Sequence, residues 1–180
     1  MNFILFDIEA TCWDGYHSNG IQEIIELGAI SYDRFGEESG TFLEFVRPEI
    51  NPRLSKYCME LTGITQNEVD SAADFNTVYD DFEDWVRPDS DTWFVSWGDF
   101  DLAIMNASCE RWNNGSSFIQ NHLDLQVQYA NLKLISPRTS LVHAIEMEEW
   151  EFEGVPHRAM PDTRNMARIF FEFLPHWTLM

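Results

Sequence analysis

The segment FILFDIEAT, residues 3–11, sets the architecture that we expect for this chain. Its first four residues are apolar, which is typical of a buried strand, and the acid Asp7 follows them directly. If the strand continues through Glu9, Asp7 and Glu9 project from the same face, while Ile8 turns towards the core. Two carboxylates on one face suit Mg²⁺ or Mn²⁺. Alternating acids also occur at solvated strand ends, so this pair alone does not establish a metal site.

The rest of the chain alternates between strand and helix patterns. Residues 24–33 and 38–47 are rich in β-favouring residues, and we expect them to form an antiparallel meander with the first strand. Thr65 and Glu68 have the spacing of a capping box at the start of a short helix. This order favours a single α/β domain over residues 1–180, with helices flanking a central mixed β-sheet. The other expected elements are a strand at 92–97 and helices at 74–86, 99–112, 139–148 and 162–173, whereas residues 113–138 show no clear pattern.

The composition favours a compact protein in a reducing compartment. The 180 residues are enough to bury a sizeable core. Cys12, Cys58 and Cys109 are widely spaced and form no CxxC pair, so we expect no disulfide framework, no structural zinc site and a cytoplasmic location. The first residues lack a basic leader, and no apolar stretch is long enough to cross a bilayer. We therefore expect neither a secretory signal nor a membrane partner.

The net charge of −20 argues against binding of polyphosphates by bulk electrostatics, because the summed field repels nucleic acids and membrane surfaces. A protein that binds only the last few nucleotides of a nucleic-acid strand can have an acidic surface if divalent metals supply positive charge at the binding site. Binding by such a protein should be weak, salt-sensitive and non-processive.

A second pair of acids lies in SWGDFDLAIM, residues 96–105, where an expected buried strand gives way to an expected helix. Acids in a first helical turn commonly cap free N–H groups and interact with the positive end of the helix dipole. We assign the capping role to Asp99 and the metal-ligand role to Asp101.

A third group lies in GVPHRAMPDTRNMARIF, residues 154–170, where His157 and Asp162 bracket a short loop before the last helix. Taken singly, Asp162 is explained equally well as a helix N-cap, and His157 as a solvated surface group. Together with the other acids they match the needs of phosphodiester hydrolysis. Four carboxylates can hold two divalent ions about 3.5–4 Å apart, and a histidine can take a proton from water.

These motifs resemble those of the DEDDh exonucleases, the family that includes RNase T and the proofreading subunit of bacterial DNA polymerase III. FDIEAT resembles the first motif of that family, SWGDFDLAIM the second, and HRAMPD, with its His-x4-Asp spacing, the third. The Eri-type branch is the most similar. Its pattern is echoed from Phe3 to about Phe171 by FDIEATCW, EIIELGAI, VRPEINPRLSKYCMELTGITQNEVDSA, SWGDFD and FEGVPHRAMPDTRNMARI.

The resemblance implies a ribonuclease H-like fold and a 3′→5′ exonuclease that releases 5′-mononucleotides from single-stranded RNA or DNA 3′ ends. It implies that His157 activates the attacking water. It also implies that Thr11 contacts the terminal nucleotide and that Leu61 and Ile64 pack against its base. Two Mg²⁺ or Mn²⁺ ions would be ligated by Asp7, Glu9, Asp101 and Asp162.

Two other functions compete with this one. A phosphatase of the haloacid dehalogenase type would use Asp7 as its nucleophile, but its motif has Asp where this chain has Glu9. That class also needs a downstream lysine, and the chain offers only Lys56 and Lys133 and would leave His157 unexplained. The second alternative is a catalytically idle interaction module with an acidic surface. Against it stands the presence of all five expected catalytic positions, which a binding module has no physical reason to keep together.

Overall fold

The computed structural model describes residues 1–15, 20–112 and 115–179. Within them, the centre of the molecule is a mixed five-stranded sheet with the order β3-β2-β1-β4-β5. The first three strands form the antiparallel meander that the sequence predicts, and β4 and β5 continue the sheet in parallel with β1. The strands are β1 (Asn2–Ala10), β2 (Ile24–Asp33), β3 (Glu38–Phe45), β4 (Thr92–Ser96) and β5 (His122–Asp124).

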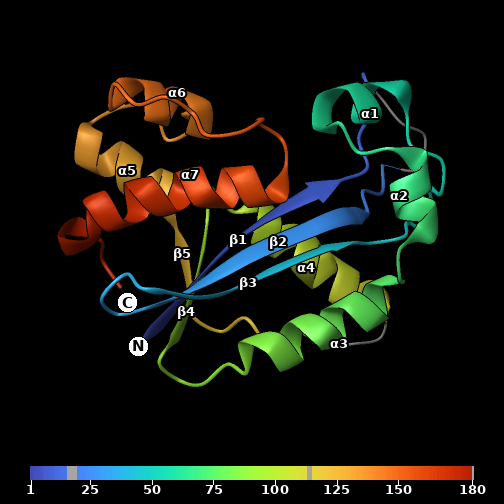
Figure 1. Ribbon diagram of the computed structural model, residues 1–180, viewed down its shortest axis with the longest axis horizontal. Helices are drawn as coiled ribbons and strands as arrows, with labels where there is room; N and C mark the ends of the chain where they lie inside the picture. The colour runs from blue at the N-terminus through green and yellow to red at the C-terminus, as the bar shows by residue number, and fades with distance from the viewer. Residues whose placement is uncertain (16–19, 113–114, 180) are drawn as a thin grey trace.

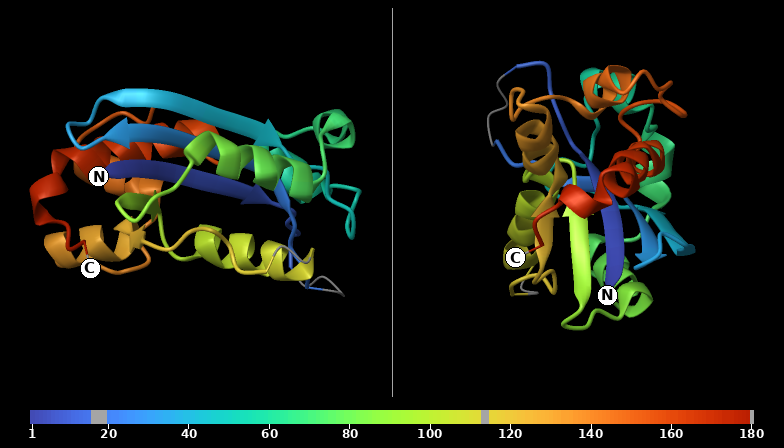
Figure 2. Two further views of the ribbon diagram at one scale, coloured as in Figure 1. Left: turned by 90° about the horizontal axis from the view of Figure 1, so that it is seen from below. Right: turned by 90° about the vertical axis from the view of Figure 1, so that its left-hand side faces the viewer.

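Helices cover both faces of this sheet (Figure 1). Helices α5, α6 and α7 lie over one face and α3 and α4 lie over the other (Figure 2). Helices α1 and α2 stand at the end of the sheet towards which β1 runs. This arrangement confirms the predicted α/β fold with helices flanking a mixed sheet. The helices are α1 (Lys56–Thr62), α2 (Gln66–Ser71), α3 (Phe75–Val86), α4 (Phe100–Arg111), α5 (Leu125–Lys133), α6 (Leu141–Met147) and α7 (Ala159–Glu172), and a 3-10 turn follows at Leu174–His176.

Strand β1 separates two cores because its side chains alternate between the faces. Ile4 and Ile8 belong to the core beneath α3 and α4, whereas Phe3 and Leu5 belong to the core beneath α7. The alternation places the odd-numbered positions of β1, which include both of its acids, on the side of α7.

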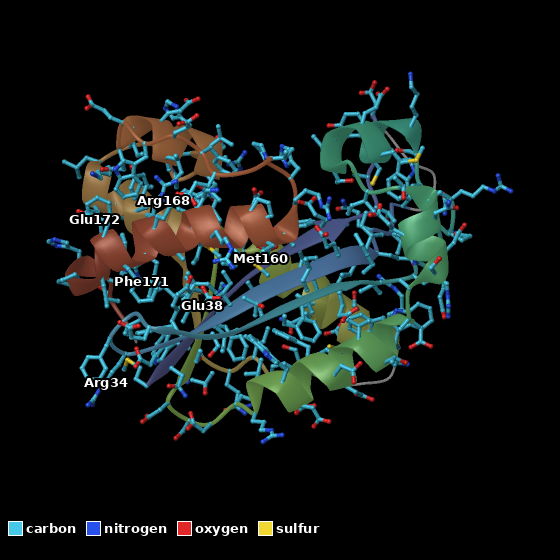
Figure 3. The ribbon with its side chains drawn as sticks, in the orientation of Figure 1. Arg34, Glu38, Met160, Arg168, Phe171 and Glu172 are labelled. Carbon is cyan, nitrogen blue, oxygen red and sulfur yellow. The ribbon has the colours of Figure 1, made fainter. Side chains whose placement is uncertain are left out.

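Helix α7 lies close against the sheet. Figure 3 shows Met160 and Phe171 on the side of α7 that faces the strands, and Arg168 and Glu172 on the opposite side. Close approach is possible because β2 has Gly28 beneath the start of α7. A Cβ atom at that position would lie 2.7 Å from the Cβ atom of Ala159. The glycine therefore sets the distance between the first turn of α7 and the strand beside β1.

The structure also departs from the sequence-based expectations. Strand β5 and helix α5 lie in the segment that showed no clear pattern, because a strand of three residues has too few positions to display an alternation. Helix α7 begins at Ala159, three residues before the predicted start. Pro161 does not prevent this, because the N–H groups of a first helical turn have no intrahelical partner. The capping box of Thr65 and Glu68 is confirmed. No helix in the described residues is long and apolar enough to span a bilayer.

Candidate active site

Strand β1 carries the first two acids of the site. It continues past the apolar run to Ala10, so Asp7 and Glu9 both lie within the strand. Glu9 is buried, with 9% of its surface exposed, and Asp7 is partly exposed. In the antiparallel ladder Asp7 lies opposite Gly28, and Glu9 lies opposite Glu26. The two acids therefore lie under the beginning of α7.

The third acid, Asp101, comes from the first turn of α4. The ladder between β1 and β4 ends at the pair Leu5 and Val95, which leaves the next edge of β1 open. Asp101 fills this edge, because its Oδ1 atom accepts a hydrogen bond from the backbone N–H of Ile8 at 2.9 Å. Asp101 thereby places its carboxylate at the residue between Asp7 and Glu9.

Asp99 has a different environment. It is exposed and occupies the N-cap position of α4, as expected, but its side chain makes no capping hydrogen bond within the described part of the chain. Only its backbone carbonyl takes part, by accepting a hydrogen bond from Ala103 N–H at 3.0 Å. The expected side-chain cap is therefore wrong. Asp99 remains outside the contacts that hold Asp101.

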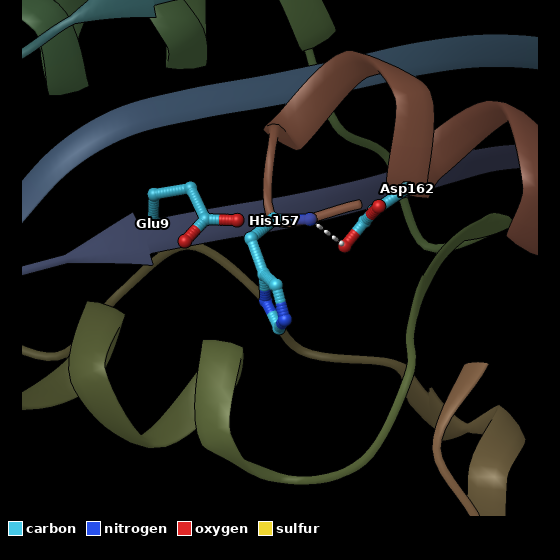
Figure 4. A group of neighbouring side chains, drawn as sticks. All are labelled: Glu9, His157 and Asp162. Carbon is cyan, nitrogen blue, oxygen red and sulfur yellow. Dashed lines mark hydrogen bonds between the residues drawn. The ribbon is translucent and has the colours of Figure 1, made fainter. Parts of the chain in front are cut away.

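The third sequence motif meets the end of β1. Glu9, His157 and Asp162 each offer one metal-ligating atom, and these atoms lie within 4.8 Å of one another (Figure 4). Asp162 belongs to the first turn of α7, and its Oδ2 atom accepts a hydrogen bond from the backbone N–H of His157 at 3.3 Å. The alternative role of Asp162 as a helix N-cap does not hold, because α7 starts at Ala159 and its N-cap residue is Arg158. His157 is exposed and its backbone is left-handed, with φ of 63°.

The four acids act on one another electrostatically, and we call Asp7, Glu9, Asp101 and Asp162 the carboxylate cluster. Burial raises the pKa of Asp7 well above its usual range, and the charges of Asp101, Asp162 and Glu9 raise it further. Burial and the nearby Asp162 raise the pKa of Glu9 to about 8. The pKa values of Asp101 and Asp162 rise to about 7 through burial, although each carboxylate accepts a backbone N–H that opposes the rise.

The carboxylate cluster fits divalent cations. The Oδ1 atom of Asp162 is buried and has no hydrogen-bond partner among the described residues. Such an atom is costly to bury unless something else binds it. Burial and the repulsion between neighbouring acids both disfavour the charged carboxylates, and a bound cation would offset this cost. Carboxylate oxygens are the donors that Mg²⁺ and Mn²⁺ prefer.

The three residues expected to bind the terminal nucleotide lie near the end of β1 but differ in exposure. Thr11 is 2% exposed, and its Oγ1 atom accepts a hydrogen bond from Glu23 N–H at 3.0 Å. Ile64 is fully buried in a small core that includes Ile25. Of these three side chains, only Leu61 is partly exposed. Substrate contact by the three stays a prediction, and Thr11 and Ile64 have structural roles that explain their burial.

Sequence reasoning missed Glu26 and Arg158. Glu26 is 1% exposed, and the guanidinium of Arg158 binds its carboxylate at 2.7 Å. A signal was available: Glu26 interrupts the otherwise apolar run IIELGAI of β2, and a charge in a buried strand requires a partner. The identity of that partner was hidden, because Arg158 lies 132 residues away in the chain.

The fold and the site together define an α/β protein of the ribonuclease H-like class, with a carboxylate cluster suited to divalent cations at one end of its central strand. Its sequence also matches one particular protein family. The family model described as Exonuclease (RNase_T) matches residues 4–170. The chain belongs to this exonuclease family.

Known proteins support the assignment. The 3'-5' exoribonuclease 1 of Homo sapiens is 31% identical over 179 residues, which cover 94% of this chain and 51% of that protein. The ERI1 exoribonuclease 2 of Danio rerio is 33% identical over 186 residues, which cover 91% of this chain and 33% of that protein. The chain thus spans about half the length of the first of these relatives, and less of the second.

Solved structures are similar over nearly the whole chain. The nuclease domain of 3'hExo, described as a DEDDh family member bound to rAMP, superimposes with a TM-score of 0.88 at 29% identity. That match covers 97% of this chain and 92% of the other. E. coli Exonuclease I in complex with a dT13 oligonucleotide shares the fold, with a TM-score of 0.77 at 15% identity. The predicted resemblance to DEDDh exonucleases and the predicted ribonuclease H-like fold are confirmed.

Proposed function

We propose that this protein is a metal-dependent 3′→5′ exonuclease that hydrolyses the terminal phosphodiester of single-stranded RNA or DNA and releases 5′-mononucleotides. The convergence of three distant sequence motifs on the end of β1 carries the proposal. Membership of the exonuclease family and the similarity to a nuclease domain bound to rAMP support it. If the protein were a catalytically idle interaction module, nothing would explain why mutually repelling acids are buried together or why Asp162 Oδ1 has no hydrogen-bond partner among the described residues.

Each side chain of the site has a role in this proposal. The carboxylate cluster would hold two divalent cations, Mg²⁺ or Mn²⁺, which when bound stabilise charge on the attacking and leaving oxygens. His157 would take the proton of the attacking water through its exposed imidazole. The Asp101 carboxylate is held by the N–H of Ile8, so it would present a fixed ligand and need little reorganisation.

The substrate of the proposed reaction is a single-stranded end. RNA is the favoured class, because the relatives include proteins named exoribonucleases. The net charge of −20 favours a short contact with the terminal nucleotides over a long track along the backbone. A reducing, cytoplasmic setting is part of the proposal, and it fits the free thiols of Cys12, Cys58 and Cys109.

The test is hydrolysis of single-stranded RNA and DNA labelled at the 3′ or the 5′ end by the pure protein. Reactions contain Mg²⁺, Mn²⁺ or EDTA, with Asp7→Ala as the matched variant. We expect metal-dependent release of 5′-mononucleotides from the 3′ end, faster on RNA, and no release by Asp7→Ala. A folded, metal-binding protein that releases nothing from any substrate would refute the proposal.

A further inference from the structure

We propose that Glu26 and Arg158 form a clamp that positions His157 at the carboxylate cluster. The inference rests on the proposed function of His157, which it deepens by naming the residues that hold this side chain in place. Neither residue of the clamp is assigned a contact with the substrate. Both are positioning residues.

The clamp joins the beginning of β2 to the loop that carries the histidine. Its acid, Glu26, lies directly opposite Glu9 in the β1 and β2 ladder. The guanidinium of Arg158 donates from Nη2 to Glu26 Oε1 at 2.7 Å and from Nε to Glu26 Oε2 at 3.1 Å. This is the planar two-pronged geometry that arginine forms with carboxylates and that lysine cannot reproduce.

The same carboxylate also holds the backbone. Glu26 Oε2 accepts a hydrogen bond from the N–H of Ala159, the first residue of α7, at 2.9 Å. Two consecutive residues, Arg158 and Ala159, are thus tied to one buried acid. His157 immediately precedes them, so its Cα atom is within one peptide unit of a fixed point.

The backbone of His157 needs such support. It adopts φ of 63°, a left-handed conformation that an L-residue occupies only where its surroundings impose it. Its own contact with the site, from its N–H to Asp162 Oδ2, is long at 3.3 Å. The shorter bonds of the clamp supply the constraint that this contact lacks.

A different role for Glu26 is to act as a fifth acid of the carboxylate cluster. The hydrogen bonds argue against it. Both oxygens of Glu26 already accept from Arg158, and one of them also accepts from Ala159. Glu26 is already engaged in an ion pair with Arg158, so its carboxylate is not a free ligand beside Glu9.

The test uses the double variant Glu26→Gln/Arg158→Gln in the full chain. It removes both charges of the clamp together, so the net charge beside the carboxylate cluster is unchanged. The matched control is Glu38→Gln/Arg164→Gln, which removes an ion pair of 3.2 Å whose side chains are 39% and 45% exposed. Arg164 also belongs to α7 but makes no bond to the loop that carries His157 among the described contacts.

We expect kcat of the double variant to fall by about 100-fold with KM within about threefold, because a small misplacement of a reacting group has this effect on rate. The control should keep wild-type kcat. When the double substitution is added to His157→Ala, kcat should fall by less than about twofold relative to His157→Ala alone, since the clamp acts through that histidine. The proposal would be overturned if the double substitution lowered kcat equally in the wild type and in His157→Ala, or if the folded double variant had wild-type kcat.

Two further measurements separate the clamp from folding and from the proposed function. If the double variant proves unstable, Arg158→Lys takes its place in the test. This substitution keeps the positive charge and loses the two-pronged hydrogen bonding, so its kcat should lie between those of the wild type and His157→Ala. In nitrogen-15 correlation spectra, the cross-peaks of the His157 ring are assigned by their absence in His157→Ala. These cross-peaks should shift in the double variant and not in the control. This readout decides the clamp even if the wild type hydrolyses no nucleic acid, an outcome that would remove only the proposed function.

Discussion

The carboxylate of Asp101 caps an open edge of β1, since its Oδ1 atom accepts the backbone N–H of Ile8 at 2.9 Å. This single bond joins the second acid-bearing motif to the first. It also places the Asp101 carboxylate at Ile8, the residue between Asp7 and Glu9 in the strand. The site is thus assembled by a strand edge that the neighbouring strand β4 leaves unpaired.

The first prediction separates Asp101 from Asp99. Asp101→Asn keeps an oxygen that can accept the Ile8 N–H and removes the charge, so the fold should survive. We expect kcat to fall by about 100-fold or more, as for other losses of an electrostatic group in an active site. Asp99→Asn should keep most of the activity, because that side chain is exposed and holds no cap. Steady-state kinetics of both variants decide the assignment, and an inactive Asp99→Asn beside an active Asp101→Asn would reverse it.

The second prediction concerns pH and stability without metal. The pKa of Glu9 is raised to about 8, and those of Asp101 and Asp162 to about 7, above the ordinary values of 4.5 and 3.8. The folded protein therefore binds more protons than the unfolded chain between about pH 4 and pH 8. Its free energy of unfolding should fall as pH rises through this range. Thermal unfolding in EDTA should give a lower Tm at pH 8 than at pH 5.5.

The matched variants for this experiment are Asp7→Asn and Asp80→Asn. Asp7→Asn removes one charge from the carboxylate cluster and should raise the metal-free Tm at pH 8 by at least about 2–4 °C, or about 1 kcal/mol in a chain of this size. Asp80→Asn changes an exposed acid of α3 and should leave the pH dependence as it is. Mg²⁺ should reduce the difference between the Tm at pH 5.5 and the Tm at pH 8, since it binds the carboxylate cluster of the folded protein. A Tm that does not depend on pH in EDTA would contradict the electrostatic account.

Much of the site follows from sequence alone because local periodicity determines it. The alternation of β1 fixes the common face of Asp7 and Glu9 without any knowledge of the rest of the chain. The position of Asp101 could be inferred only as a preference over Asp99, because the deciding bond reaches the backbone of Ile8, 93 residues earlier. Arg158 could not be predicted at all, since neither its partner nor the register of β2 is encoded near it.

The third prediction concerns the rim of the site. Phe100 precedes Asp101 in the first turn of α4 and is 45% exposed. Exposed aromatic rings stack on nucleic-acid bases, and such stacking contributes about 1–3 kcal/mol per base. Phe100→Ala should therefore raise KM by about tenfold or more, with a smaller change in kcat. Phe35→Ala is the control, because Phe35 is 75% exposed and lies in the β2 to β3 turn at the other end of the sheet. Equal KM values for wild type and Phe100→Ala would exclude a stacking role.

The last prediction concerns the distance between β2 and α7. In Gly28→Ala the new methyl group would meet the Cβ atom of Ala159 at 2.7 Å and its backbone carbonyl carbon at 3.0 Å. Backbone cannot move aside as the end of a side chain can, so we expect a loss of about 1–3 kcal/mol in the free energy of unfolding. The first turn of α7 carries Asp162, so kcat should fall as well. Gly40→Ala is the control in β3, where the nearest atom, in the ring of Trp85, would be 3.6 Å from the new Cβ atom. Chemical denaturation and kinetics of both variants test this account. Gly28→Ala with wild-type stability and kcat would show that close packing of α7 on Gly28 does not set the geometry of the site.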